Sequence, residues 1–412
     1  MAVTDHEYPR LRNSLAAAPV GSDGDMTVQL HDTSGITSAA LNLSVPAFEL
    51  VRHFDGNHRL VDIQADYARQ FGRLLMTAEL IELIERMDEA GFLDTPRFQA
   101  MYATLVDEYR NQPARPMRAL EATGSDAAGL QMEIDAIVAE GTGDEHGSGS
   151  VVGLIAPHLD WPRGRPCYAK AYAALAGNCR AKRFVILGTN HFGQSASVVA
   201  TAKDFETPFG RLGCDRDFLG AIERRLGASL LEHELDHANE HSIELQIPFV
   251  HHLFNDDAIT LVPVLCPDPC GPTGTEPYDG RGIDLRRFAE ALGEAIADDP
   301  VDTCVIVGAD LSHVGMQFGD ERRLDPEFLD EVARQDADAL DRLDADGAEP
   351  FRRHLAATGN PTRICSAGAI FTLATALPDA RPERLGYHQA ADEPTQCCVT
   401  CTAYAFRKPS PV

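Results

Sequence analysis

The sequence predicts an α/β protein in which a central, mostly parallel sheet is flanked by helices and is preceded by a small winged-helix-like α+β domain. From residue 151 onward, unbroken apolar runs such as Val305-Ile306-Val307 alternate with helical segments, which is typical of strands covered on both faces. Before that point, a hairpin, three helices and a short closing strand follow one another. In a chain of 412 residues these observations predict two domains, residues 1–110 and residues 111–412.

The first domain contains short elements with clear boundary signals. Residues 27–31 alternate polar and apolar side chains as a half-buried strand does, and Ser44 is a typical helix N-cap ahead of Pro46. Gly91 ends a predicted helix. The Pro-containing residues 111–116 are expected to be a linker. The remaining predicted elements are strands at residues 40–43 and 92–93 and helices at residues 60–71 and 77–90.

The second domain is expected to alternate strands with helices. Its predicted strands are residues 151–156, 184–187, 197–201, 258–265, 303–307 and 399–406, the last with alternate residues buried. Its predicted helices are residues 130–139, 168–176, 215–226, 242–254, 285–297 and 326–343, and a further helix that opens near Cys365 and continues to Ala376. Such alternation is the pattern of a layered α/β sheet.

Composition limits the classes of function. A formal charge of -27 argues against binding to nucleic acid or to an anionic membrane, because phosphates would be repelled over the whole surface. The first residues show no basic segment followed by an apolar one, and no apolar run approaches the roughly 18 residues that span a bilayer. We therefore expect a cytoplasmic protein whose ten cysteines stay reduced.

Three histidines follow predicted strands. His158 comes after the strand at 151–156, His191 after the strand at 184–187, and His313 after the strand at 303–307. Ligands of open α/β sheets bind at the carboxyl ends of strands, and imidazole is both the commonest metal ligand and an effective acid or base near pH 7. The three histidines therefore predict one shared site.

Two further segments carry reactive side chains. Glu240 and Glu244 are four residues apart on a predicted helix and would share a face, with His241 near its start. Cys365 opens a predicted helix, where a thiol can serve as a thiolate ligand or as a nucleophile. A zinc site is a weaker alternative, in which the C-x-x-C of Cys398 and Cys401 would meet two other cysteines, Cys266 and Cys270.

Seven motifs in a fixed order carry a family resemblance. They are Ala156-Pro157-His158, Gly188-Thr189-Asn190-His191, Thr207-Pro208-Phe209-Gly210, Glu240-His241-Ser242-Ile243-Glu244, Val262-Pro263-Val264, Asp310-Leu311-Ser312-His313-Val314-Gly315 and then Cys365. Over about residues 115–406 the chain resembles the MEMO family, whose bacterial members are called AmmeMemoRadiSam system protein B. The resemblance implies a fold like that of class III extradiol dioxygenases and protein partners from a radical-SAM-associated system. It also implies a metal bound by His158, His191 and Cys365, and a pocket whose catalytic residues are His313, Asp310 and His241.

The first domain carries a second, shorter resemblance. Leu43-Ser44, Phe54-Asp55-Gly56 and Gly91-Phe92-Leu93 occur in the order seen in PqqD-like peptide-recognition modules, over about residues 25–95. This resemblance implies that the domain docks a peptide or a protein partner. An accessory oligomerisation domain is the alternative, since one fold hosts many functions.

The chemistry of the implied ligands favours Fe(II). Two imidazoles and one anion suit non-haem iron, whereas a thiolate in place of a carboxylate moves the preference toward Cu or Zn. With iron, His313 would move a proton for a phenolic or redox-active substrate; with zinc, His313 would act as a base oriented by Asp310. We expect a dioxygenase-like redox enzyme acting on a small-molecule or peptide substrate. A non-catalytic adaptor and a zinc hydrolase are the alternatives.

Overall fold

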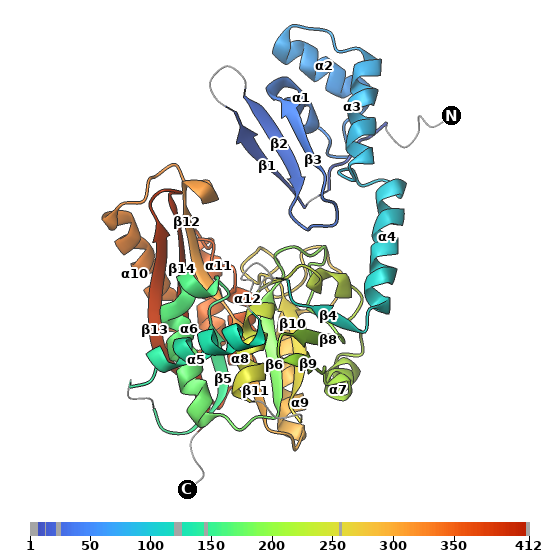
Figure 1. The fold of residues 1–412 in the computed structure, drawn as a ribbon. Coiled ribbons are helices and arrows are strands. Elements are labelled where there is room, and N and C mark those ends of the chain that lie inside the picture. Colours follow the sequence, from blue (N-terminus) through green and yellow to red (C-terminus); the bar gives the residue numbers. More distant parts are fainter. Residues whose placement is uncertain are drawn as a thin grey trace. The chain divides into compact units, whose positions relative to one another are not determined.

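Figure 1 shows the computed structural model of the chain, which describes residues 7–12, 14–21, 26–118, 126–143, 147–254 and 258–408. The chain divides into two compact units, Met1–Asn111 with His191–Gln194 and Gln112–Asn190 with Ser195–Val412. No helix within the described ranges is long and apolar enough to cross a membrane.

A three-stranded antiparallel sheet followed by four helices forms the first unit. β2 (Thr27–Asp32) lies between β1 (Leu15–Val20) and β3 (Ala40–Ser44). The helices are α1 (Val45–Val51), α2 (Leu60–Phe71), α3 (Thr77–Glu89) and α4 (Pro96–Asn111). Leu30 of the sheet, Ile63 of α2 and Ile84 of α3 are among the residues of one shared core. This arrangement buries one face of the sheet under the helices.

Most predicted boundaries in this unit are confirmed. The Ser44 hydroxyl accepts a hydrogen bond from the backbone N–H of Ala47 and so caps α1, and Gly91 follows α3 with a φ of 71°. The prediction of a closing strand at residues 92–93 is wrong, because Leu93 forms only an isolated bridge with Leu11. Phe92 and Leu93 are 0% and 1% exposed, and a strand of a sheet with one open face does not bury two successive side chains.

The predicted linker at residues 111–116 is wrong in part. α4 continues to Asn111, and β4 (Ala114–Pro116) pairs in parallel with β8 (Asp204–Thr207), which in turn pairs with β9 (Gly210–Leu212). Pro113 precedes this short edge strand and Pro116 is its last residue, and an edge strand tolerates proline. The segment therefore belongs to a small three-stranded sheet of the second unit.

An eight-stranded sheet forms the centre of the second unit, in the order β12-β14-β5-β11-β6-β10-β7 with β13 paired to β14. Its strands are β5 (Ser150–Ala156), β6 (Arg183–Thr189), β7 (Val199–Ala200), β10 (Thr260–Cys266), β11 (Thr303–Gly308), β12 (Asp310–Gly315), β13 (Arg381–Asp392) and β14 (Cys397–Lys408). β5, β11, β6 and β10 are parallel, whereas the other four pair antiparallel. The α/β class is confirmed, but the sheet is mixed and only its centre is parallel.

Helices cover both faces of this sheet. On β11, Val305 and Val307 belong to one core cluster and Ile306 to another, because successive side chains of a strand point to opposite faces. α5 (Ala127–Glu140), α6 (Trp161–Asn178) and α8 (Ile247–Leu253) contribute to the Ile306 cluster. The other cluster includes residues of α7 (Arg216–Leu226), α9 (Leu285–Asp298), α10 (Pro326–Asp346), α11 (Ala348–Thr358) and α12 (Ala367–Ala376).

The helix predicted at residues 242–254 exists only in its second half. Residues 244–246 form a 3₁₀ turn, and α8 begins at Ile247 with Pro248 in its first turn, where proline is favoured. Before it, the Glu240 carboxylate accepts a hydrogen bond of 2.8 Å from the backbone N–H of Ser242 and stabilises a non-helical turn. Glu240 and Glu244 therefore do not share a helix face, and this part of the prediction is wrong.

Asp336 on α10 is a fully buried carboxyl group that ties the helix to three strands. It is 0% exposed and accepts hydrogen bonds from the hydroxyls of Ser312 at 2.6 Å, Thr400 at 2.6 Å and Tyr387 at 2.8 Å. Burial raises the pKa of Asp336. Because Ser312 precedes His313 on β12, this network holds β12 against α10.

Replacing Asp336 by alanine is expected to lower the free energy of unfolding by about 3 kcal/mol, because three hydroxyls lose their acceptor and a cavity remains. The raised pKa means that the fold favours the protonated carboxyl, so the stabilisation by Asp336 declines as the pH rises through that pKa. Urea unfolding followed by the fluorescence of Trp161, the single tryptophan, measures the change. Asp338→Ala removes an exposed carboxylate of the same helix and is the control. Equal losses in both variants would contradict the role of the network.

Candidate metal centre

The carboxyl ends of three adjacent strands position the predicted site residues. β5, β11 and β6 are neighbours and run parallel, so the segments that follow them meet at one edge of the sheet. His158 lies two residues beyond β5, and His191 lies two residues beyond β6. β12 begins two residues beyond β11 and carries Asp310 and His313. Parallel pairing thus explains why residues distant in sequence gather here.

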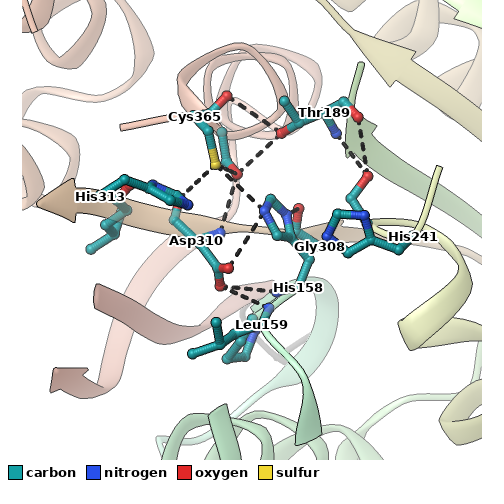
Figure 2. A network of polar contacts seen from close by, with 12 residues as sticks. His158, Leu159, Thr189, His241, Gly308, Asp310, His313 and Cys365 are labelled. Atoms are coloured by element: carbon teal, nitrogen blue, oxygen red, sulfur yellow. Dashed lines mark hydrogen bonds and ion pairs between the residues drawn. The ribbon is translucent and has the colours of Figure 1, made fainter. Parts of the chain in front are cut away.

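His158 is buried among the other polar side chains of this edge (Figure 2). Its Nδ1 lies 2.9 Å from the carbonyl oxygen of Gly308, and because a carbonyl only accepts, this contact places the proton on Nδ1. Its Nε2 lies 3.4 Å from Sγ of Cys365 and 3.5 Å from Oδ2 of Asp310. The basic nitrogen of the ring therefore faces a thiol and a carboxylate.

Asp310 holds the backbone on which His158 lies. Its Oδ1 accepts hydrogen bonds of 3.1 Å from the backbone N–H groups of His158 and Leu159, while Oδ2 faces the imidazole. The side chain is 2% exposed, and the backbone N–H of Asp310 donates to Oγ of Ser366 at 3.2 Å. One carboxylate oxygen thus orients the loop and the other faces the candidate site.

Cys365 lies two residues before α12, and its backbone is fixed to β6. The hydroxyl of Thr189 lies 3.4 Å from the carbonyl oxygen of Cys365 and 3.2 Å from Oγ of Ser366. The Cys365 thiol itself lies 3.4 Å from Oγ of Ser366 and 3.9 Å from the carbonyl oxygen of Asp310. These contacts bring the thiol to the carboxyl edge of the parallel strands.

His241 also belongs to this group. Its ring lies edge-to-face against His158, with centroids 5.5 Å apart, and Figure 2 shows the two side by side. Its Nδ1 lies 3.4 Å from the carboxylate of Glu240, which is 1% exposed. One ligand atom from each of His158, His191 and His241 lies within 4.8 Å of the others. The structure thus adds a third imidazole to the two histidines predicted as ligands.

His313 is positioned by the backbone of its own strand. Its Nδ1 lies 3.0 Å from the carbonyl oxygen of Leu311, and its ring lies edge-to-face against Phe318 with centroids 5.2 Å apart. Its backbone N–H donates to the carbonyl of Thr362 at 2.8 Å. Figure 2 shows the imidazole turned toward Cys365. With the proton on Nδ1, Nε2 is the atom that can accept one.

Arg115 anchors the loop that carries His241, and sequence reasoning missed it. The side chain is 2% exposed and donates to the carbonyl oxygens of His237 at 2.7 Å and Glu240 at 2.6 Å. Its Nη1 lies 2.7 Å from the carboxylate of Glu244. A single arginine between two prolines forms no pattern, so no signal in the sequence marked it.

Two glycines at strand ends let this loop approach the sheet. A Cβ on Gly308 would lie 2.0 Å from the carbonyl oxygen of Ser242, and a Cβ on Gly188 would lie 2.4 Å from Oγ of Ser242. That Oγ accepts a hydrogen bond from the backbone N–H of Thr189 at 3.0 Å and lies 3.2 Å from its carbonyl oxygen. Glycine at these two positions therefore lets Ser242 pack closely against the strand ends.

The cysteines of the alternative zinc site do not meet. Cys266, Cys398 and Cys401 lie in three different core clusters, and all ten cysteines, which the described ranges include, are free thiols. Burial raises the pKa of Cys266 and of Cys398 to about 12, which keeps both thiols protonated. The alternate burial predicted for residues 399–406 is also wrong, since β14 is buried from Cys397 to Arg407.

The fold and the site define an α/β protein with a histidine-rich candidate metal centre at the carboxyl edge of its parallel strands. A family model described as Memo-like protein matches residues 118–397, so the chain belongs to this family and the MEMO resemblance is confirmed. A MEMO1 family protein of Thermus thermophilus is 27% identical over 343 residues, which cover 82% of this chain and 96% of the relative. A MEMO1 family protein of Methanopyrus kandleri is 33% identical over 168 residues, 39% of this chain and 53% of the relative.

Proposed function

We propose that this protein is a metal-dependent redox enzyme that uses non-haem Fe(II), with Cu and Zn as the competing metals. One observation carries the proposal: one nitrogen from each of three imidazoles lies within 4.8 Å of the other two, with a thiol and a carboxylate beside one of the rings. Nitrogen, sulfur and oxygen donors together suit a first-row transition metal better than Mg²⁺ or Ca²⁺, which prefer oxygen ligands.

The polar contacts of two of these histidines support metal ligation. Nδ1 of His158 is held by the carbonyl of Gly308, and Nδ1 of His241 lies beside the Glu240 carboxylate. A ligating imidazole almost always donates its other ring N–H to a carbonyl or a carboxylate, which fixes the tautomer and makes the ligating nitrogen more basic. Both rings are thus oriented through Nδ1, which leaves Nε2 to bind a metal.

We propose His158 and His191 as two ligands and Cys365 as the third. Cys365 is favoured because its Sγ lies 3.4 Å from Nε2 of His158, and a thiolate would supply the anion of a two-histidine site. His241 is the alternative third ligand, because it belongs to the mutually close group. The two sets differ chemically, since three neutral imidazoles are typical of zinc and a thiolate favours a softer ion.

The side chains of this site are proposed to orient the substrate and to move its proton. When bound, Fe(II) would supply an electron and open coordination positions for dioxygen or a redox-active substrate. His313, with Nδ1 held by the Leu311 carbonyl, would accept a phenolic proton at Nε2. Asp310 would keep His158 in place through the two backbone N–H groups that it accepts. His241, backed by the Glu240 carboxylate, would stabilise negative charge on the substrate.

The substrate proposed is a small molecule or a peptide with a phenolic or other redox-active group. The first unit is proposed to act as a PqqD-like docking module for that peptide or for a protein of a radical-SAM-associated system. A net charge of -27 supports the exclusion of nucleic acid and of an anionic membrane as partners.

Metal analysis of the full-length protein, purified without added metal, tests this proposal. We expect about one iron per chain in the wild type and a lower content in His158→Ala, whose affinity for iron should fall at least about tenfold, because loss of a ligand weakens binding at least as much as loss of a residue behind it. Cys365→Ser and His241→Ala compare the two candidate third ligands. His354→Ala, a histidine of α11 outside the group, is the control.

The outcomes separate the competing functions. Iron that is lost in His158→Ala and Cys365→Ser, together with oxygen uptake when a catechol is added, supports the redox enzyme with a thiolate ligand. Loss of bound iron in His241→Ala but not in Cys365→Ser would overturn the thiolate ligand. Zinc without oxygen uptake would overturn the redox activity in favour of a hydrolase. A metal content unchanged by both His158→Ala and Cys365→Ser would reject the metal centre and leave an adaptor.

A further inference from the structure

A second group of potential metal ligands lies in the first unit, between α1 and α2. One ligand atom from each of His53, His58 and Asp66 lies within 4.8 Å of the others. We propose that these three side chains bind one divalent transition-metal ion of the zinc, nickel or copper type. The site is independent of the candidate centre described above, because it shares no ligand with it.

The geometry of the three side chains is close to that of a bound state. Nδ1 of His53 lies 3.9 Å from Oδ2 of Asp66, and the rings of His53 and His58 are edge-to-face with centroids 5.5 Å apart. In a tetrahedral site with metal–ligand bonds of about 2.0–2.1 Å, donor atoms lie about 3.3 Å apart, so each pair needs to close by about 1.5 Å or less. Side-chain rotation supplies such a shift, since the three side chains are between 24% and 41% exposed.

The backbone that carries these ligands is well anchored. Phe54, next to His53, is 2% exposed and donates its backbone N–H to the carbonyl of Val51 at 3.0 Å. Gly56, with a φ of 79°, donates to the carbonyl of Pro9 at 2.9 Å. Asp66 lies on α2, which is fixed to the core by the buried Ile63 and Tyr67. Because the loop and the helix are already fixed, their backbone loses little conformational entropy when the ligands bind a metal.

A carboxylate behind His58 gives it the orientation expected of a ligand. Nδ1 of His58 lies 3.0 Å from both oxygens of Asp55, and Asp55 also accepts the backbone N–H groups of Asn57 at 2.8 Å and His58 at 3.1 Å. This carboxylate–histidine pair resembles the arrangement behind ligating imidazoles in metalloproteins and leaves Nε2 to bind the ion.

The donor set also defines the class of ion. Two imidazole nitrogens and one carboxylate oxygen suit Zn²⁺, Ni²⁺ or Cu²⁺, whereas Mg²⁺ and Ca²⁺ prefer oxygen ligands alone. The bound ion would link the loop after α1 to the middle of α2. We therefore expect metal binding to rigidify residues 53–66.

Arg69 provides a test in which a substitution is expected to strengthen metal binding rather than weaken it. Its guanidinium pairs with Oδ1 of Asp66 and is 77% exposed. This positive charge competes with a cation for the same carboxylate, so Arg69→Ala is expected to tighten metal binding. Exposed ion pairs contribute about 0.2–1 kcal/mol, which corresponds to a gain in affinity of about 1.4- to 5-fold.

Equilibrium dialysis of the full-length protein over a series of Zn²⁺ concentrations, with metal analysis of the bound zinc, tests the site. The double variant His53→Ala/His58→Ala is expected to bind about one zinc fewer per chain than the wild type, and Asp66→Asn is expected to bind more weakly. Hydrogen–deuterium exchange is expected to slow over residues 53–66 on adding zinc, in the wild type but not in the double variant. His354→Ala, outside both groups, is the control for loss of a surface histidine.

Two results would overturn the site: an unchanged zinc stoichiometry in the double variant, or zinc-dependent protection of residues 53–66 that persists without both histidines. An affinity for zinc that does not rise in Arg69→Ala would contradict ligation by Asp66. His158→Ala separates this inference from the proposed function, because it removes a ligand of the other group only. Zinc-dependent protection of residues 53–66 in His158→Ala supports this site whatever the outcome at the other.

Discussion

Arg115→Ala is expected to lower the free energy of unfolding of the second unit by about 3–5 kcal/mol, the cost of breaking a buried ion pair by removing one partner. The guanidinium is 2% exposed and donates to two carbonyl groups, those of His237 and Glu240, besides facing the buried carboxylate of Glu244. Without it, the buried Glu244 carboxylate and both carbonyls lose this donor. The loop that carries His241 is then expected to loosen.

Urea unfolding followed by Trp161 fluorescence measures this loss in the second unit, because Trp161 is the single tryptophan and its Nε1 donates to the carbonyl of Leu245 at 3.3 Å. Arg115→Lys keeps the charge but not the planar fork, so it is expected to lose less stability than alanine. Arg118→Ala is the matched control, since this exposed arginine also contacts the loop, at Asn239, and is expected to cost about 0.5 kcal/mol or less. Losses of similar size in Arg115→Ala and Arg118→Ala would contradict the anchoring role.

The same variant separates the two candidate third ligands. If His241 binds the metal, Arg115→Ala is expected to lower metal content, because Arg115 holds the carbonyl of Glu240 next to it. If Cys365 binds the metal, the content is expected to change less, since Cys365 is fixed by Thr189 and Ser366 instead. Metal content in folded Arg115→Ala therefore reports on His241 without altering any donor atom.

The parallel centre of the fold could be predicted because the apolar composition of each strand indicates that both of its faces are covered. Strands such as Phe184–Leu187 and Val305–Val307 are apolar on both faces, and that composition alone requires helices above and below. The antiparallel side could not be predicted in the same way. β13 has only half-buried or exposed side chains and no alternation, so its pairing with β14 depends on tertiary context.

The strand-end histidines could be anticipated because parallel strands align their carboxyl ends. His158 and His191 each lie two residues beyond a strand, and their ligand atoms are close in the structure. The position of His241 could not be derived this way. It depends on a non-helical turn, on Arg115 from a distant strand, and on Gly308, whose missing side chain lets the turn approach. Such contacts leave no periodic trace in a sequence.

His237 is expected to make the stability of the same loop dependent on pH. The side chain is 1% exposed, and its Nε2 lies 3.1 Å from the carbonyl oxygen of Val199, which places the proton on that nitrogen. Burial, helped by the nearby Arg115 guanidinium, lowers the pKa of His237 to about 3, against the opposing effects of the Val199 hydrogen bond and the Glu240 carboxylate. In the unfolded chain the pKa is about 6.5. The fold therefore favours neutral His237, and as the pH falls from about 6.5 toward 3 the unfolded chain binds a proton that the folded chain does not.

His237→Gln is expected to remove this dependence while keeping a side-chain N–H for the Val199 carbonyl. At pH 7 the variant is expected to be less stable than the wild type, because glutamine fills the buried site less well. Below pH 6.5 the wild type loses up to about 1.4 kcal/mol more per pH unit than the variant, so the gap narrows by about 2–3 kcal/mol by pH 4.5. Urea unfolding at pH 7 and at pH 4.5, followed by Trp161 fluorescence, measures the difference in stability between the two proteins, with His354→Gln as the control. All other titrating groups are common to both proteins. If the free energy of unfolding falls equally with pH in the wild type and in His237→Gln, His237 does not set the acid stability of this loop.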